Sequence, residues 1–301
     1  MNPDKESFLE LVYEARIGDL LKGSEKKHFE ASGIYLKGGY LHIIFDDEPS
    51  LLRIRPNWLQ IDEEPYLFPL KSTGAGYEDI TFQSSTGRWL CLIEAVKTKS
   101  DVYMPLIDEF DESFSFIRSY WLNFPLKEGN KGFEGLAIIH NKGTDYLLCL
   151  CEGNDCKSGE KGAKPGKGRI QVFEQVGEHW EHTGTIRLPG AVRFKDYVSL
   201  DFSNGLLTVI SQASSALWIG HCRSLHQGLD NLFDDDGQSF LFPRDEKNRT
   251  MYCNMEGVAW LGNGQLVVVS DKVKPDQPGR CSRKDQSIHI FKLPDEDLPL
   301  N

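Results

Sequence analysis

The chain has 301 residues, of which 40% are hydrophobic and 26% charged, an ordinary composition for a globular protein. Its net charge of −11 argues against nucleic acid as a partner, because phosphate backbones are bound by basic surfaces. No apolar run is long enough to span a membrane, and the polar residues 1–7 predict no signal peptide. Seven cysteines at irregular spacing, several of them inside apolar strands, predict free thiols in a reduced, cytoplasmic protein.

Five short phrases recur along the chain and predict a repeat architecture. In each, a short polar or acidic residue stands two places before a branched aliphatic residue, and an apolar strand follows after a turn or a glycine. The two clearest phrases are Phe133 to Ile138 and Met255 to Trp260. Aligned on the polar residue, the phrases start at Ser32, Glu78, Glu134, Asp196 and Glu256, which lie 46, 56, 62 and 60 residues apart.

Repeats of this length predict an all-β fold, a single β-propeller domain over residues 1–301. Propeller blades are four-stranded sheets of about 40 to 50 residues, and propellers have about four to eight of them. Five blades are the direct count here, and six would require one copy that has diverged beyond recognition. In chain order, the second strand of each predicted blade is Tyr40 to Phe45, Trp89 to Ile93, Tyr146 to Cys151, Leu206 to Ile210 and Gln265 to Ser270.

The last predicted blade lacks a strand of its own. After Glu256 the chain has room for only three strands, of which the last is Ser287 to Leu293. Propellers usually close by pairing a strand from one terminus with the blade formed by the other, which leaves no open edge. We therefore expect Phe8 to Tyr13 to supply the fourth strand and to close the ring.

The repeated polar residue is predicted to lie on the propeller axis. The first strand of each blade lines the central channel, so equivalent side chains form a ring of Ser32, Glu78, Glu134, Asp196 and Glu256. Carboxylates that converge repel one another and lose solvation, which raises some of their pKa values or requires a counter-ion. A hard divalent cation meets this need, and calcium accepts irregular shells of about six to eight oxygen ligands.

The same pattern has a second interpretation. Each acid would cap backbone amides at the start of its blade, or face a water-filled channel, and would bind no metal. In the fourth repeat, Ser199 would replace Asp196 on the ring if the register slips.

A second set of polar residues follows the second strand of each unit and is predicted to lie at one mouth of the channel. Its members are Asp46 with Asp47, Glu94, Glu152 and Asp271, with Ser211-Gln212 at the equivalent place in the fourth unit. Lysines come shortly afterwards in two units, Lys97 in one and Lys272 with Lys274 in the other. Acids and bases together favour a small polar or anionic ligand bound through a bridging cation, and ordinary loop hydrogen bonds are the alternative.

Two phrases, Glu134-Gly-Leu-Ala137 and Glu256-Gly-Val-Ala259, resemble those of phytase-like (esterase-like-activity-of-phytase) propellers. The order serine, glutamate, glutamate, short polar residue, glutamate is also similar to that of the calcium-activated nucleotidases, which are five-bladed propellers with one axial calcium. This resemblance implies calcium ligands at Ser32, Glu78, Glu134 and Glu256, with Asp196 where a serine is expected. The nucleotidases' Gly-Lys-Glu-Trp loop and arginine-bearing loop have no counterpart at residues 94–97 and 152–156.

The sequence therefore predicts a propeller with an axial divalent cation, calcium in the first place, that binds a small polar or anionic ligand at the channel mouth. It contains no Gly-x-Ser-x-Gly, His-Glu-x-x-His or P-loop motif, and no nucleophile or base is identified. Two alternatives stay open. One is a calcium-dependent hydrolase of small phosphoesters, and the other is a protein-interaction propeller in which calcium is structural.

Overall fold

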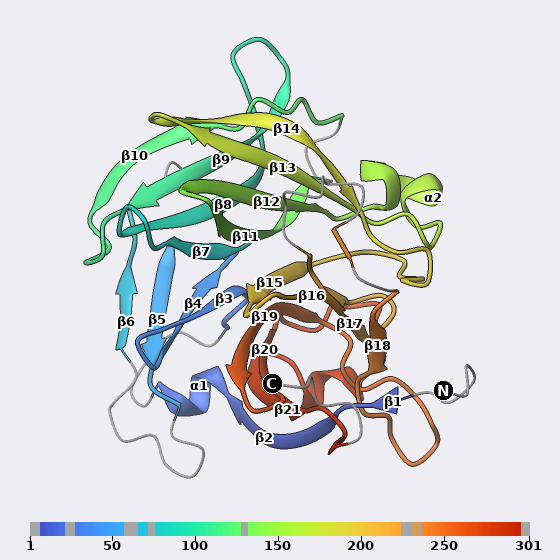
Figure 1. Ribbon diagram of the computed structural model, residues 1–301. Coiled ribbons are helices and arrows are strands. Elements are labelled where there is room, and N and C mark those ends of the chain that lie inside the picture. The colour runs from blue at the N-terminus through green and yellow to red at the C-terminus, as the bar shows by residue number, and fades with distance from the viewer. Residues whose placement is uncertain are drawn as a thin grey trace.

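The computed structural model describes residues 7–21, 28–56, 66–71, 76–127, 132–223, 232–233 and 236–295. These residues form five antiparallel four-stranded sheets arranged around one axis, a five-bladed β-propeller (Figure 1). The innermost strands β3, β7, β11, β15 and β19 pack against one another around the axis. The predicted fold class and the count of five blades are confirmed.

The blades follow one another along the chain, each running from the axis outward. Blade one is β3 (Ala31–Lys37), β4 (Tyr40–Phe45), β5 (Ser50–Ile54) and β6 (Tyr66–Pro69). Blade two is β7 (Ile80–Gln83), β8 (Arg88–Lys97), β9 (Tyr103–Phe110) and β10 (Phe116–Trp121). Blade three is β11 (Phe133–Asn141), β12 (Thr144–Cys151), β13 (Arg169–Val176) and β14 (His179–Arg187).

The last two blades include both ends of the described chain. Blade four is β15 (Ser199–Ser203), β16 (Leu206–Ser211), β17 (Ala216–His221) and β18 (Gln238–Leu241), to which β1 (Ser7–Phe8) adds in parallel. Blade five is β19 (Met255–Gly262), β20 (Gln265–Ser270) and β21 (Ser287–Lys292), completed by β2 (Glu10–Arg16). Short helical turns are α1 (Ile17–Leu20), η1 (Asn154–Cys156), α2 (Gly159–Gly162) and η4 (Cys281–Arg283).

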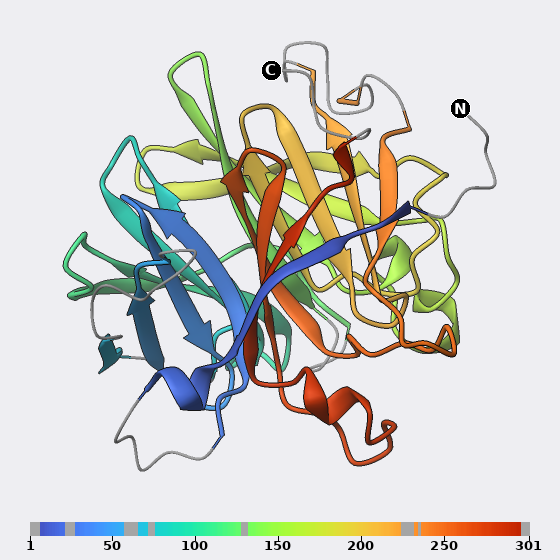
Figure 2. The same cartoon turned by 90° about the horizontal axis from the view of Figure 1, so that it is seen from below.

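Ring closure takes place as predicted, with a shifted strand. Strand β2 pairs antiparallel with β21, from Glu10 opposite Lys292 to Arg16 opposite Ser287, and runs beside the C-terminal strands in Figure 2. Phe8, which was expected in this strand, lies in β1 and pairs with Leu241 of blade four. The N-terminal segment thus joins blades four and five. The Leu9 N–H donates a hydrogen bond to the Leu241 carbonyl of blade four (2.9 Å), and β2, which follows, belongs to blade five.

The core is divided into five hydrophobic clusters, each between two neighbouring blades. A blade in a closed ring is covered on both faces, so its second strand is apolar without alternation. In β16 all six residues are buried, and in β12 the last five are. This explains the apolar runs that marked the second strands in the sequence.

The cysteines differ from the prediction. Cys151 pairs with Cys156, and Cys253 with Cys281, with Cα separations of 5.1 and 5.6 Å. The expectation of free thiols is therefore wrong for these four, because irregular spacing along the chain says little about which residues the fold brings together. Cytoplasmic localisation, which rested in part on that expectation, stays a prediction. Among the described helices, none has the length and apolar character needed to cross a membrane.

Candidate metal centre

In three of the five blades a local irregularity of the innermost strand directs one polar residue into the cavity. In blades one and three the pairing with the second strand skips Ser32 and Glu134, and in blade five it skips Glu256 and the glycine after it. A bulge of this kind turns a side chain out of the regular alternation. The skipped residue is the polar residue on which the repeats align.

These residues meet in one cavity at the end of the channel, with one from each blade. This inner ring consists of Ser32, Glu78, Glu134, Val198 and Glu256. An outer ring of Asp46, Glu94, Glu152, Gln212 and Asp271 lines the same cavity. Four of these residues directly follow the second strand of their blade, whereas Glu94 lies inside β8, where the pairing with β9 is irregular between Ile93 and Val96. Four of the five predicted axial residues, and every predicted mouth acid except Asp47, are therefore brought together.

Two predicted site residues lie elsewhere. Asp196 is not among the residues that line the cavity, and it accepts hydrogen bonds from Ser211 Oγ (2.6 Å) and the Ala213 N–H (3.0 Å). It caps a turn, which is the alternative that the sequence had left open. Lys97 forms an ion pair with Asp101 at 2.6 Å and is likewise not a lining residue.

The inner-ring position in blade four belongs to Val198, not to Asp196 or Ser199. Val198 follows Tyr197 as Glu134 follows Phe133 and Glu78 follows Tyr77, and its N–H bonds to Ile210 at the end of the second strand. In four of the five blades a large apolar residue precedes the ring position, and this residue locates the position better than the acid itself does. Aligning the repeats on carboxylates placed the fourth copy two residues too early.

The cavity has a volume of about 440 Å³ and is strongly acidic. Among the residues that the structure describes, eight carboxylates line it but only two lysines, Lys272 and Lys274, both from the segment that follows β20. The sequence analysis had not singled out Glu30, which comes just before β3 and lies 3.7 Å from the Lys272 ammonium. No histidine or cysteine is present among the described lining residues, so the donors are oxygens.

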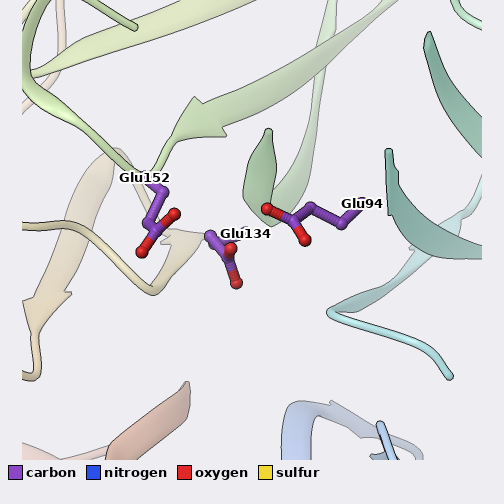
Figure 3. Close-up of side chains that lie close together, drawn as sticks. All are labelled: Glu94, Glu134 and Glu152. Atoms are coloured by element: carbon purple, nitrogen blue, oxygen red, sulfur yellow. The ribbon is translucent and has the colours of Figure 1, made fainter. Parts of the chain in front are cut away.

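Three glutamates converge most closely. One carboxylate oxygen each from Glu94, Glu134 and Glu152 lie within 4.8 Å of one another, and Figure 3 shows Glu134 between the other two. The Gly132 N–H donates to Glu94 Oε1 (2.8 Å). Backbone hydrogen bonds from Glu152 to Gly132 (3.1 Å) and from Tyr197 to Glu152 (2.9 Å) fix the end of β12. The trio is therefore held by the ends of two neighbouring blades.

Burial and mutual repulsion raise the pKa values of four carboxyl groups that line the cavity. Burial, reinforced by Glu94 and Asp46, raises the pKa of Glu78 to about 8. Burial and the charge of Glu78 raise the pKa of Glu134 well above its usual value, and burial with Asp271 does the same for Glu256. Burial also raises the pKa of Asp271 to about 7. A bound cation would favour the ionised forms of all four groups.

Next to the inner ring the innermost strands of neighbouring blades are in close contact. A Cβ built on Gly135 would lie 2.5 Å from Leu200 Cδ2, and one on Gly33 would lie 2.7 Å from the Asp79 backbone. Asp79 is fully buried here and accepts hydrogen bonds from the N–H groups of Leu136 (2.8 Å) and Ile80 (2.9 Å). The glycine after the repeated polar residue is thus required by close contact between neighbouring innermost strands.

The comparisons with known proteins bear on the fold. No protein-family model and no curated protein matches the sequence. Among solved structures, a GH43_1 enzyme from Xanthomonas citri is similar with a TM-score of 0.56, 10% identity, and coverage of 96% of this chain and 93% of its own. Glutaminyl cyclase from Myxococcus xanthus is similar with a TM-score of 0.54 and 8% identity, and the match covers 97% of this chain and 100% of the cyclase. The calcium-binding protein regucalcin from Agrobacterium tumefaciens is similar with a TM-score of 0.52 and 11% identity, and the match covers 96% of each chain.

At this level of identity the likeness shows a shared fold and no common activity. Neither the phytase-like family nor the nucleotidases are identified by these matches. What the chain demonstrably shares with the three proteins is the propeller architecture in which its acidic cavity is built.

Proposed function

We propose that this protein is a propeller that binds a divalent cation, calcium in the first place, in the acidic cavity at the end of its channel. Glu94, Glu134 and Glu152 would hold the ion, and Glu78 lies close enough to Glu134 to contribute a further oxygen. The observation that carries the proposal is the convergence of three carboxylate oxygens within 4.8 Å. Two ligands of one calcium ion are at most about 5 Å apart, since each lies about 2.3 to 2.6 Å from it.

The donor set favours a hard cation. Described lining residues offer carboxylate, hydroxyl, amide and backbone oxygens, and no nitrogen or sulfur ligand of the kind that zinc or copper prefers. The pKa of Glu78 is raised because the carboxyl group is buried and because Glu94 and Asp46 repel its ionised form. A cation removes that repulsion, so binding would be coupled to the loss of protons.

The cavity has room for more than an ion. Its volume of about 440 Å³ falls within the range of about 300 to 1,000 Å³ of small-molecule sites. Lys272 and Lys274 supply positive charge on one wall only. A small anionic ligand, such as a carboxylate or a phosphate, would be held between the cation and these two ammonium groups.

Thermal unfolding with calcium, magnesium or a chelator tests the cation. A ligand at 100 times its Kd adds about 2.7 kcal/mol to the stability of the folded state. We expect calcium to raise the Tm of the parent protein and to have little effect on Glu134→Gln and Glu152→Gln. Asp196→Asn is the matched control, because that carboxylate lies outside the cavity lining. Equal calcium responses in all four proteins would exclude the proposed ligands.

A calcium-dependent phosphoesterase is the second candidate, and Asp271 is the residue that favours it. This side chain lines the cavity beside Lys272, and its pKa of about 7 suits a general base near neutral pH. A panel of small phosphoesters, assayed with calcium and with chelator, tests it. Hydrolysis that Asp271→Asn abolishes, with calcium-linked stabilisation retained, would support the enzyme. Calcium binding without turnover of any ester would leave a binding protein.

A further inference from the structure

The connection between β12 and β13 in blade three is unusually long. It spans residues 152–168, whereas the same connection has only four or five residues in blades one, two and four. Loops longer than about 12 to 15 residues are uncommon in compact domains and usually have a function. This loop begins at Glu152 of the outer ring, so it lies on the face of the propeller that holds the cavity. Figure 1 shows its short helix α2 at the periphery of the ring.

Positive charge is concentrated at this loop in an otherwise acidic protein. Residues 153–169 and 187–196, which we call the basic surface, contain eight lysines and arginines and three acids, although the whole chain has a net charge of −11. The two segments are in contact, because the Leu188 N–H donates to the Gly168 carbonyl (3.1 Å) and Asn154 Nδ2 donates to the Phe194 carbonyl (3.1 Å). All of the eight basic residues except Arg169 are exposed.

The backbone of the loop is fixed from within. Asn154 is fully buried, its Nδ2 donates to the Gly162 carbonyl (2.8 Å), and its Oδ1 accepts from the Lys167 N–H (2.8 Å). One side chain thus joins the start, the middle and the end of the loop, and the Cys151–Cys156 disulfide closes its first turn. The lysines are therefore carried by a backbone that is ordered before any partner binds. Such preorganisation lowers the entropic cost of binding.

Asp155 lies where three of the basic groups converge. Its Oδ2 is 3.4 Å from Lys157 Nζ and 3.3 Å from Lys167 Nζ, and its Oδ1 accepts from Arg169 Nη2 (2.7 Å). One carboxylate thus balances one of three positive charges and occupies the point at which a compact anion would bind. The remaining basic groups are spread over an exposed surface. This arrangement suits a ligand with several spaced carboxylates better than a single phosphate.

The composition of the basic surface distinguishes between classes of large anion. In its two segments, all of whose residues the structure describes, no aromatic side chain is exposed on which nucleic acid bases could stack. Its large apolar residues Leu188, Val192 and Phe194 are buried, so none of them can insert into a lipid bilayer. An anionic membrane would also cover the neighbouring cavity and be repelled by its eight carboxylates. A peptide can contact the basic surface alone.

We propose that the basic surface is a docking site for an acidic segment of a partner protein, one with several aspartates or glutamates in succession. Carboxylates of the segment pair with the exposed lysines and arginines, and the fixed loop backbone sets their spacing. Complementary charge of this kind steers association and gives specificity. No residue of the basic surface is among those that line the cavity, so docking is independent of the proposed cation.

The experiment measures fluorescence anisotropy of a labelled, N-acetylated peptide of ten glutamates, with chelator present so that no cation contributes. We expect saturable binding that weakens as salt screens the exposed charges, and no binding of the matching glutamine peptide. Lys161→Glu/Lys164→Glu should weaken binding by at least about 5-fold, because one exposed ion pair contributes up to about that factor. Lys99→Glu/Lys142→Glu is the matched control, since it makes the same change in net charge at exposed lysines outside the basic surface.

A second arm uses the native protein and does not depend on the folding of any variant. Carbodiimide cross-linking of the glutamate peptide, mapped by mass spectrometry, should join it to Lys157, Lys161, Lys164 or Lys167. Absence of peptide binding at low salt, an equal loss of affinity in both double variants, or cross-links confined to other lysines would each overturn the proposal. Tighter binding of phosphatidylserine vesicles or of a single-stranded oligonucleotide, lost in Lys161→Glu/Lys164→Glu, would assign the surface to a different partner and reject the proposal.

Discussion

Replacing Gly135 by alanine tests how closely the innermost strands of blades three and four must pack beside the site. The new Cβ would lie 2.5 Å from Leu200 Cδ2, 2.9 Å from Leu200 N and 3.1 Å from Ser199 Cα. Carbon atoms in favourable contact are about 3.5 to 4.0 Å apart, so the innermost strands of blades three and four would have to move apart by about 1 Å. Since two of the three contacts are backbone atoms, rotamer changes cannot relieve the clash. Overpacking of this kind costs about 1 to 3 kcal/mol.

Thermal unfolding converts this cost into a measurable shift. At about 2.1 cal/mol/K per residue, unfolding of a chain of 301 residues has an entropy of roughly 600 cal/mol/K. We therefore expect the Tm of Gly135→Ala to fall by about 2 to 5 °C. Gly190→Ala is the matched control, because nothing lies within 4 Å of its added Cβ. Identical melting of both variants and the parent would refute the argument that close strand contact requires the glycine.

The remaining predictions concern the pH dependence of stability and calcium binding, the strand pair that closes the ring, and Asp196. Burial raises the pKa of Glu78 to about 8, so its contribution to metal-free stability should be complete below the unfolded value of about 4.5 and lost as pH rises through about 8. Calcium should cancel that loss and bind more tightly at pH 8 than at pH 6, which calorimetry would check, and a pH-independent Kd would contradict it. Glu14→Gln should lower the free energy of unfolding in urea by about 2 to 3 kcal/mol, because Glu14 accepts from Lys284 Nζ (2.8 Å) and lies 3.0 Å from His289 Nδ1, across the closing strand pair. An unchanged urea midpoint would show that these bonds do not hold the ring shut. Asp196→Asn should weaken the turn at Ser211 and leave calcium affinity unchanged, and a lower affinity would return Asp196 to the site.

The repeats in the sequence determined the architecture. Each blade is one supersecondary unit that cannot bury its faces alone, so five copies of the unit specify a closed ring. The three-stranded last unit required a strand from the other end of the chain, and β2 supplies it. Four of the five ring positions followed as well, because a residue at the same place in each copy lies at the same distance from the axis.

The local sequence pattern did not identify the inner-ring residue of blade four, because a residue there had two plausible roles. Asp196 fits the repeat as well as Glu134 does, yet its carboxylate is satisfied by the turn at Ser211 and Ala213, and Val198 takes the ring position. Only the pairing of β15 with β16 fixes that register, since hydrogen bonds between strands, and not spacing along one strand, decide which residue faces the axis.

Long-range proximity was decided by the tertiary structure alone. Cys253 and Cys281 are 28 residues apart, and nothing in their spacing indicates that blade five brings them together. The same holds for Glu94, Glu134 and Glu152, which the sequence placed in two separate sets and the fold places within 4.8 Å. The sequence determined four of the five residues of the inner ring, because periodicity along the chain becomes symmetry in the ring. The distances between side chains depend on how neighbouring blades pack, and a repeat pattern carries no information about that packing.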